Sequence, residues 1–169
     1  MKIRSCYKCI LVLLMSYGFS SFSFATDIIN LIKLFEGSHK QNDMHVAYIC
    51  PAGVKTIAWG LTNVKKTSLT EDEADALLRL KIMETNKCID RHVKVHLSDN
   101  QRTALISFIF NIGNSAFLRS NVYKAIKSHR LADVPKELLK WKYITKGKKQ
   151  VVSRGLHNRR LQEIKLWNS

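Results

Sequence analysis

The chain has 169 residues, which is enough for one domain, or one domain with two lobes, around a sizeable core. It carries 28 Lys and Arg against 13 Asp and Glu, a formal net charge of +15. A positive charge of this size affects which polyanionic partners the protein meets and how fast it meets them, but it does not indicate the fold. Because basic residues occur along the whole chain without a nucleic-acid-binding motif or a set of stacking aromatics, we expect no nucleic-acid partner. Bacterial walls and outer leaflets are polyanionic too, and a generally cationic secreted protein is the simplest interpretation of this composition.

The N-terminal segment 1–25 has the features of a secretory signal. It begins with basic residues, continues with a short apolar run (Ile10–Met15) and ends in Ser23-Phe24-Ala25. We therefore predict a signal peptide over 1–25, cleavage before Thr26, and a secreted or periplasmic product of residues 26–169. The apolar run is well short of the roughly 20 residues that a stable membrane span needs.

Four cysteines occur in the chain, and Cys6 and Cys9 lie inside this signal. The product would keep Cys50 and Cys88, in an oxidising compartment if it is exported. Parity makes a Cys50–Cys88 disulfide a simple expectation, although sequence alone cannot give the distance between their Cα atoms.

The first half of the product predicts a helix, a hairpin and a long helix. Residues 27–35 show helical periodicity after Asp27, a possible N-cap, and 45–62 show a hairpin pattern broken by Pro51-Ala52-Gly53. Thr70 and Glu73 form a capping-box pattern that opens a helix over 70–91.

The second half predicts helices almost throughout. Ser98 and Gln101 form a second capping-box pattern, and the very apolar helix that follows stops at Gly113. Further helices are predicted at 120–129, at 133–143 with Asp133 as N-cap and Pro135 in the first turn, and at 154–167. Residues 146–149 are predicted to be a polar, basic connector. The chain should therefore be α+β, mainly α, with a small hairpin-containing lobe joined by the helix 70–91 to a helical lobe and a ligand cleft between them.

Three segments, in the right order, resemble one enzyme family. Phe35-Glu36-Gly37 with Cys50–Thr62 is similar to the active-site segment of phage-type lysozymes, the endolysins of glycoside hydrolase family 24. Ser98–Phe117 resembles the central helix of the family's larger lobe, and Arg154–Trp167 resembles its closing helix. The resemblance covers roughly residues 27–168 and implies a lysozyme-like two-lobed fold. Two departures are an insertion of about five residues around 39–45 and an altered segment at 58–61.

The resemblance implies three catalytic residues. Glycoside hydrolysis needs an acid for the leaving oxygen and a second group for water or the sugar carbon. Glu36, a single carboxylate at the end of an apolar helix, would be the acid. Cys50 stands where relatives carry Asp or Cys and would handle the water together with Thr56, although Cys50 in a structural disulfide remains an alternative. Asp43, in the inserted segment, is a rival second carboxylate.

The resemblance also implies a cationic face toward the acid. In lysozymes of this type an Arg of the closing helix faces the catalytic Glu, which makes Arg159 and Arg160 candidate substrate-binding residues. Trp59 is a third candidate because it could stack on a sugar face, although core packing is the better expectation for it. The irregular spacing of His39, Asp43, His45 and Cys50 matches no zinc pattern, so we expect neither metal nor cofactor.

The sequence thus predicts a monomeric muramidase. It would hydrolyse the β-1,4 bond between N-acetylmuramic acid and N-acetylglucosamine in peptidoglycan, causing bacteriolysis. One alternative is a lysozyme-like wall-binding or effector protein that has lost turnover. Some endolysins keep an uncleaved signal-anchor that is later released, so residues 1–25 could instead hold the protein at the membrane transiently.

Overall fold

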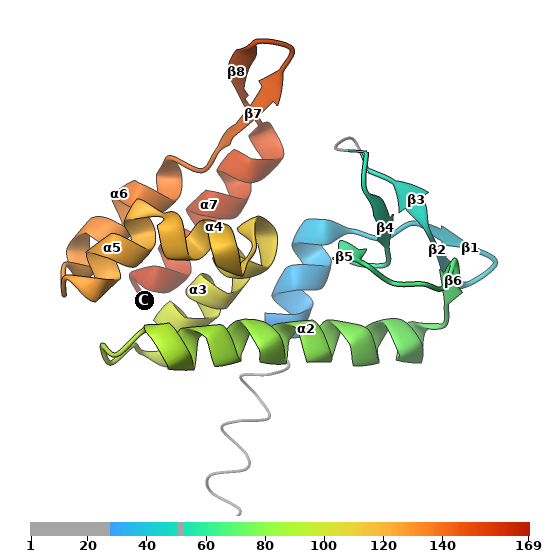
Figure 1. The fold of residues 1–169 in the computed structure, drawn as a ribbon, viewed down its shortest axis with the longest axis horizontal. Helices are drawn as coiled ribbons and strands as arrows, with labels where there is room; N and C mark the ends of the chain where they lie inside the picture. The colour runs from blue at the N-terminus through green and yellow to red at the C-terminus, as the bar shows by residue number, and fades with distance from the viewer. Residues whose placement is uncertain (1–27, 51–52) are drawn as a thin grey trace, which may run out of the picture.

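The computed structural model describes residues 28–50 and 53–169. The predicted signal over 1–25, the N-cap at Asp27 and the Pro51-Ala52 turn lie outside the described residues. A helix runs through 28–36 and is drawn blue in Figure 1. It ends at Glu36, and Gly37 follows with φ +59°.

The smaller lobe contains two three-stranded antiparallel sheets. Their orders are β1-β2-β6 and β3-β4-β5. The strands are β1 (Lys40–Gln41), β2 (Met44–Val46), β3 (Tyr48–Ile49), β4 (Lys55–Ile57), β5 (Leu61–Thr62) and β6 (Ser68–Leu69). The second sheet contains the hairpin predicted within 45–62.

The inserted segment folds into a regular hairpin. Asn42 and Asp43 join β1 to β2 with φ of 48° and 61°, the positive values that a two-residue type I′ turn requires. Strand β2 then pairs with β6 through His45 and Leu69. The extra residues are therefore integrated into the smaller lobe, and Asp43 occupies the tip of this turn.

Helix α2 (Glu71–His92) joins the two lobes and underlies both of them in Figure 1. Its capping box is formed as predicted: the amide of Glu73 donates to the Thr70 hydroxyl at 3.2 Å, and the Thr70 amide donates to the Glu73 carboxylate at 3.0 Å. The acidic residues in its first turn also stabilise the helix, because their negative charges lie at the positive end of the helix dipole.

The larger lobe is helical. It contains α3 (Asp99–Ile112), α4 (Asn114–Arg119), α5 (Asn121–Lys127), a 3₁₀ turn η1 (Leu131–Asp133), α6 (Val134–Leu139) and α7 (Arg154–Trp167). The Ser98–Gln101 capping box and the stop at Gly113 are confirmed, as are the bounds of the last helix. Sequence reasoning did not foresee the short helix α4.

Three local predictions in this lobe were wrong. The helix predicted over 133–143 ends at Leu139, and Tyr143 already begins a strand. Asp133 makes no cap hydrogen bond, because η1 already leads into α6 in a helical conformation and the Asp133 carboxylate accepts from Arg130 at 2.8 Å. Residues 146–149 are not a connector between helices. They form the turn of a hairpin of β7 (Tyr143–Lys146) and β8 (Lys149–Val152), which projects from the lobe in Figure 1.

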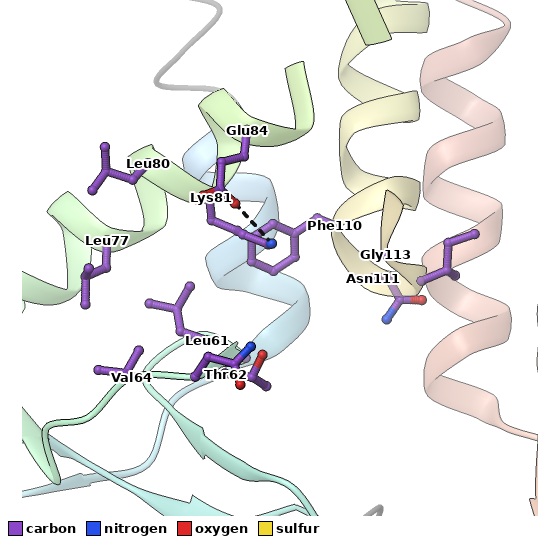
Figure 2. A pocket seen from close by; sticks show the side chains of 13 residues that line it. Leu61, Thr62, Val64, Leu77, Leu80, Lys81, Glu84, Phe110, Asn111 and Gly113 are labelled. Atoms are coloured by element: carbon purple, nitrogen blue, oxygen red, sulfur yellow. Dashed lines mark hydrogen bonds and ion pairs between the residues drawn. The ribbon is translucent and has the colours of Figure 1, made fainter. Parts of the chain in front are cut away.

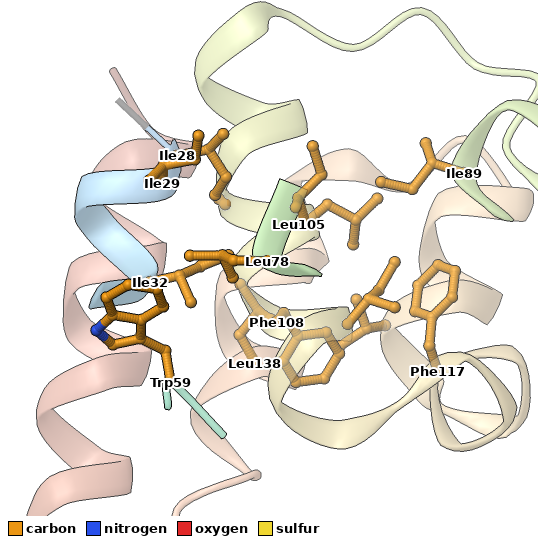
Figure 3. Close-up of a cluster of buried hydrophobic side chains, with 14 of the residues drawn as sticks. Ile28, Ile29, Ile32, Trp59, Leu78, Ile89, Leu105, Phe108, Phe117 and Leu138 are labelled. Atoms are coloured by element: carbon orange, nitrogen blue, oxygen red, sulfur yellow. The ribbon is translucent and has the colours of Figure 1, made fainter. Parts of the chain in front are cut away.

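A continuous core extends through both lobes around α3, whose residues 103–109 are all buried. In Figure 3, Ile28 and Ile32 of the first helix lie with Trp59 at one side of the cluster and Phe117 lies at the other, with Leu78, Leu105 and Phe108 between them. Burying each large apolar side chain contributes about 1.5–3 kcal/mol. The core therefore fixes the first helix, and with it Glu36, against the larger lobe.

The net charge is unevenly divided between the two halves of the chain. Residues 100–169 contain 15 Lys and Arg against 3 Asp and Glu, a net +12, whereas residues 28–99 contain 10 against 9, a net +1. Basic residues do occur throughout, but their excess lies in the larger lobe. None of the helices among the described residues is long and apolar enough to cross a bilayer.

Candidate active site

Glu36 lies at the end of the first helix, against the turn between β4 and β5. Its side chain is 19% exposed. Gly60 in that turn has φ +77°, and a Cβ placed there would lie 2.9 Å from Glu36 Oε2. Glycine thus serves two purposes at this position: it adopts the left-handed conformation and it leaves room for the carboxylate.

Arg159 of α7 reaches Glu36 from the larger lobe. Its Nη1 donates to Glu36 Oε1 at 2.5 Å, which joins residues 123 positions apart in sequence. The guanidinium also lies over the ring of Phe35, 4.9 Å from the ring centroid. A charge-assisted bond between partly buried groups is stronger than a neutral one, so this contact fixes the carboxylate in direction as well as position.

Buried groups of α3 and α7 hold Arg159 from behind. Arg159 Nε donates to Glu163 Oε1 at 3.2 Å and Arg159 Nη2 donates to the Ser107 carbonyl at 3.0 Å. The Ser107 hydroxyl donates to the same Glu163 oxygen at 2.7 Å. Ser107 and Glu163 are fully buried and Arg159 is 4% exposed.

Arg160 occupies the other side of Glu163. Its Nε lies 3.1 Å from Glu163 Oε2, and its Nη2 donates to the Asn111 side chain at 2.7 Å. Burial lowers the pKa of Arg160 to about 10. Burial likewise raises the pKa of Glu163, while the charges of Arg160 and Arg159 act in the opposite direction. The buried Glu163 carboxylate thus lies between two arginines, Arg159 and Arg160, and its charge is paired, as a buried ion requires.

Cys50 and Thr56 lie on one face of the β3–β4 hairpin. Tyr48 is directly opposite Thr56, and the amide of Cys50 donates to the Val54 carbonyl at 3.0 Å. With this register Cys50 and Thr56 are diagonal neighbours, a relation that places side chains within reach of one small molecule. Thr56 is 5% exposed, and its hydroxyl donates to the Val54 carbonyl at 3.0 Å.

A cleft of about 570 Å³ lies between the lobes. It is lined by the β4–β5 turn from Gly60 onward, by one face of α2 and by the C-terminal end of α3. Figure 2 shows Leu61 and Thr62 facing Phe110 and Asn111 across it, with Lys81 and Glu84 of α2 paired at the rim at 3.3 Å. Gly60 therefore lies between the Glu36 carboxylate and the space that a polymer would occupy, and as a glycine it has no side chain to fill the gap.

The structure supports none of the three candidate substrate contacts. Arg159 is 4% exposed, and its nitrogens are bonded to Glu36, Glu163 and Ser107. For Trp59 the expected core packing is confirmed. Trp59 is 4% exposed, with Lys33 Nζ 4.0 Å above its ring and His45 packed on its edge, so it presents no free face to a sugar. Arg160 is fully buried and cannot touch a polymer in the cleft. In all three cases tertiary packing takes up a side chain whose type alone suggested binding.

The predicted Cys50–Cys88 disulfide is absent, because Cys88 is a free cysteine on α2. Burial raises the pKa of the Cys88 thiol, which disfavours its reactive thiolate form. His45, from the set of candidate metal ligands, instead shares a hydrogen bond of 2.8 Å with Glu71. Within 28–50 and 53–169, no three His, Cys, Asp or Glu side chains gather to hold a metal ion.

Sequence reasoning missed Ser107 and Asn111. Ser107 carries its hydroxyl on the buried side of α3, and Asn111 carries its amide near the end of that helix, beside the cleft. A lone hydroxyl or amide in an apolar helix was the available signal, because a buried polar group needs a partner.

The model of the phage lysozyme family matches residues 33–163. The chain belongs to the phage lysozyme family. The resemblance seen in the sequence is thereby confirmed, and so is its placement among cell-wall-lytic, glycosidase-type hydrolases.

Individual members of the family are similar to this chain over most of their length. An endolysin of Acyrthosiphon pisum secondary endosymbiont phage 1 is 32% identical over 141 residues, covering 82% of this chain and 93% of the relative. A SAR-endolysin of Escherichia phage Mu is 33% identical over 132 residues, covering 77% of this chain and 75% of the relative.

Solved structures of phage lysozyme relatives share the fold. The muramidase domain of SpmX from Asticaccaulis excentricus is 30% identical with a TM-score of 0.75, over 85% of this chain and 95% of that domain. The endolysin from Escherichia coli O157:H7 phage FAHEc1 is 26% identical with a TM-score of 0.71, over 83% of this chain and 89% of that one. The predicted α+β, mainly helical, lysozyme-like fold is confirmed.

Proposed function

We propose that this protein is a muramidase. It hydrolyses the β-1,4 bond between N-acetylmuramic acid and N-acetylglucosamine in peptidoglycan and so lyses bacteria. The observation that carries the proposal is the Glu36 carboxylate, which is held by Arg159 at the junction of the lobes and separated from the cleft by a glycine. A positioned carboxyl beside a polymer-sized cleft is what general acid catalysis of glycoside hydrolysis needs.

In the proposed reaction, Glu36 gives its proton to the glycosidic oxygen as the bond to the anomeric carbon breaks. A water molecule held between Thr56 and Cys50 attacks that carbon, and its released proton passes to a base or to solvent. The Thr56 hydroxyl uses its proton on the Val54 carbonyl, so its lone pairs are left to accept from the water. Attack on the face of the sugar opposite the leaving group would invert the anomeric centre.

The departures from the family pattern are compatible with turnover. The insertion forms the closed β1–β2 hairpin, and in the altered segment 58–61 Gly60 is kept where Glu36 needs it. The neighbouring Trp59 is 4% exposed and belongs to the core, while Leu61 is 6% exposed and adds an apolar side chain to the lining of the cleft. Neither change removes Glu36, Thr56 or the contact of Glu36 with Gly60.

The site of action follows from the substrate. Peptidoglycan lies outside the cytoplasmic membrane, so the proposal requires export, which residues 1–25 would direct. We propose that a monomer of residues 26–169 acts in the periplasm or outside the cell. Intact-mass measurement of the exported protein tests cleavage before Thr26, and a product that retains residues 1–25 would favour the releasable anchor.

Dye release from labelled peptidoglycan tests the acid. Glu36→Gln should lower the rate by about 10²–10⁴-fold, the usual contribution of general acid–base catalysis, while the folded protein still binds sacculi. Glu137→Gln on α6 is the matched control, since it removes a carboxylate whose partner is the nearby Lys140. Wild-type-like hydrolysis by folded Glu36→Gln protein would remove Glu36 from the mechanism.

Product analysis tests the bond and separates the alternative. Hydrolysis at the proposed bond leaves a reducing N-acetylmuramic acid end, which mass spectrometry after borohydride reduction identifies. A reducing N-acetylglucosamine end would mean that the other glycosidic bond is cut. Binding of sacculi without soluble products from the wild type would instead indicate a wall-binding protein that lacks turnover.

A further inference from the structure

The guanidinium of Arg159 is shared among three partners, one for each nitrogen. Nη1 donates to the Glu36 carboxylate, Nε to the Glu163 carboxylate and Nη2 to the backbone carbonyl of Ser107. A guanidinium is planar and rigid, so fixing two of its nitrogens fixes the direction of the third. The position of the group that touches Glu36 is therefore set by the two contacts on the far side.

These two far-side groups are themselves joined and enclosed. The Ser107 hydroxyl donates to Glu163 at 2.7 Å, and both residues are fully buried, whereas the Glu36 side chain is 19% exposed. The rigid part of the network thus lies in the core, and its open end lies at the candidate acid. Ser107 and Glu163 lie behind Arg159, and neither of them lines the cleft.

Arg159 is not needed merely to join α7 to α3. Arg160 already ties α7 to α3 through Asn111 and through the ring of Phe108, 4.9 Å from its guanidinium. Arg159 adds a second link between the same helices and directs its remaining nitrogen out of the core toward the acid. The difference between the two arginines is the hydrogen bond to Glu36.

We propose that Ser107 and Glu163 are positioning residues, which act on the reaction through Arg159 by holding its guanidinium against Glu36. This inference rests on the proposed function for its kinetic consequence, while its geometric consequence stands independently. Glu163→Gln replaces one acceptor oxygen by an amide that cannot accept from arginine. Ser107→Ala keeps the backbone carbonyl that Arg159 Nη2 bonds, but it removes the hydroxyl that holds the Glu163 carboxylate in place against Arg159 Nε.

The test compares rate with binding in Ser107→Ala, in Glu163→Gln and in Thr103→Val. The last variant is the matched control, because Thr103 is a buried hydroxyl one turn earlier on α3 that bonds within its own helix at 2.8 Å. The first two variants should lose about 10- to 100-fold in rate at saturating wall substrate, as displaced catalytic groups do, with sacculus binding unchanged. Thr103→Val should stay within about twofold of the wild type.

A double-mutant cycle shows whether the effect passes through Arg159. In an Arg159→Met background, Ser107→Ala should lower the rate no further. Additive losses, or a folded Ser107→Ala protein with the wild-type rate, would overturn the proposal. If Glu163→Gln does not fold, the Ser107→Ala arm of the cycle still decides the question.

A crystal structure of Ser107→Ala separates this inference from the enzyme assignment. It should show Arg159 Nη1 moved out of hydrogen-bonding distance of Glu36, whether or not the wild type lyses walls. A hydrogen bond at the wild-type distance in the variant would refute the positioning role. If Arg159 has moved away from Glu36 in the variant but the wild type is inactive, only the muramidase assignment is refuted.

Discussion

Replacing Gly60 by alanine tests how closely the site depends on the β4–β5 turn. The new Cβ would lie 2.9 Å from Glu36 Oε2 and 3.3 Å from Glu36 Cδ, inside ordinary contact distance. The carboxylate can relieve this clash only by moving about 0.5–1 Å, since non-bonded atoms prefer separations of about 3.5–4 Å. Such a movement disturbs the 2.5 Å bond to Arg159, and a misplacement of about 1 Å can lower a rate about 10²-fold.

The same substitution also carries a backbone cost. With φ at +77°, an L-residue at position 60 should lose about 1–2 kcal/mol of unfolding free energy. Gly147→Ala is the matched control, since Gly147 lies in the β7–β8 turn and also has positive φ, +60°, but a Cβ placed there would meet no atom within 4 Å. Both variants should therefore lose similar stability.

The assay is the initial rate of dye release from labelled peptidoglycan, measured beside thermal unfolding of each protein. We expect Gly60→Ala to lose about 10- to 100-fold in rate and Gly147→Ala to stay near the wild type. Equal rates for the two folded variants would refute the reasoning, because the clash with Glu36 would then have no catalytic consequence.

Three further predictions concern the water-handling position, the charge and acid stability. In a Cys88→Ala background, alkylation of Cys50 should abolish hydrolysis and Cys50→Asp should preserve it, and full activity of Cys50→Ser would make the residue idle or structural. Binding to sacculi should fall steeply between 0.1 and 1 M salt, as the Debye length shortens from about 10 to about 3 Å, and should weaken when Lys148 and Lys149 of the larger lobe, with its net +12, are replaced by Gln. Salt-independent binding would deny the charge any part in capture. A hydrogen bond from Lys40 lowers the pKa of Glu71 from 4.5 to about 2, so this carboxylate stabilises the fold above pH 4.5 and loses its contribution as the pH falls toward 2. Because the Glu71 side chain is 46% exposed, the unfolding free energy measured in urea should fall by about 1 kcal/mol or less over that pH range. Glu71→Gln should lack this part of the fall. The same dependence of unfolding free energy on pH in Glu71→Gln as in the wild type would contradict the assignment.

The sequence by itself determined the features that depend on neighbours in the chain. The two capping boxes at Thr70 and Ser98 and the stop at Gly113 were correct, because their hydrogen bonds join residues three or four positions apart. Apolar periodicity placed the long helices for the same reason. The family pattern, read in three segments, was also sufficient to predict the fold class, and the segment Arg154–Trp167 predicted the closing helix.

Tertiary structure alone decided which side chains meet. Arg159 reaches Glu36 across 123 positions, and Ser107 completes the support from a third helix, because packing of α3 against α7 brings these groups together. Trp59 and Arg160 have the residue types of binding groups, yet both are buried, since the core and the Glu163 carboxylate take up their side chains. Residues 146–149 form a hairpin turn rather than a connector, because pairing of the flanking strands overrides their polar composition. Local patterns specify elements, whereas burial and charge pairing between distant elements specify the site.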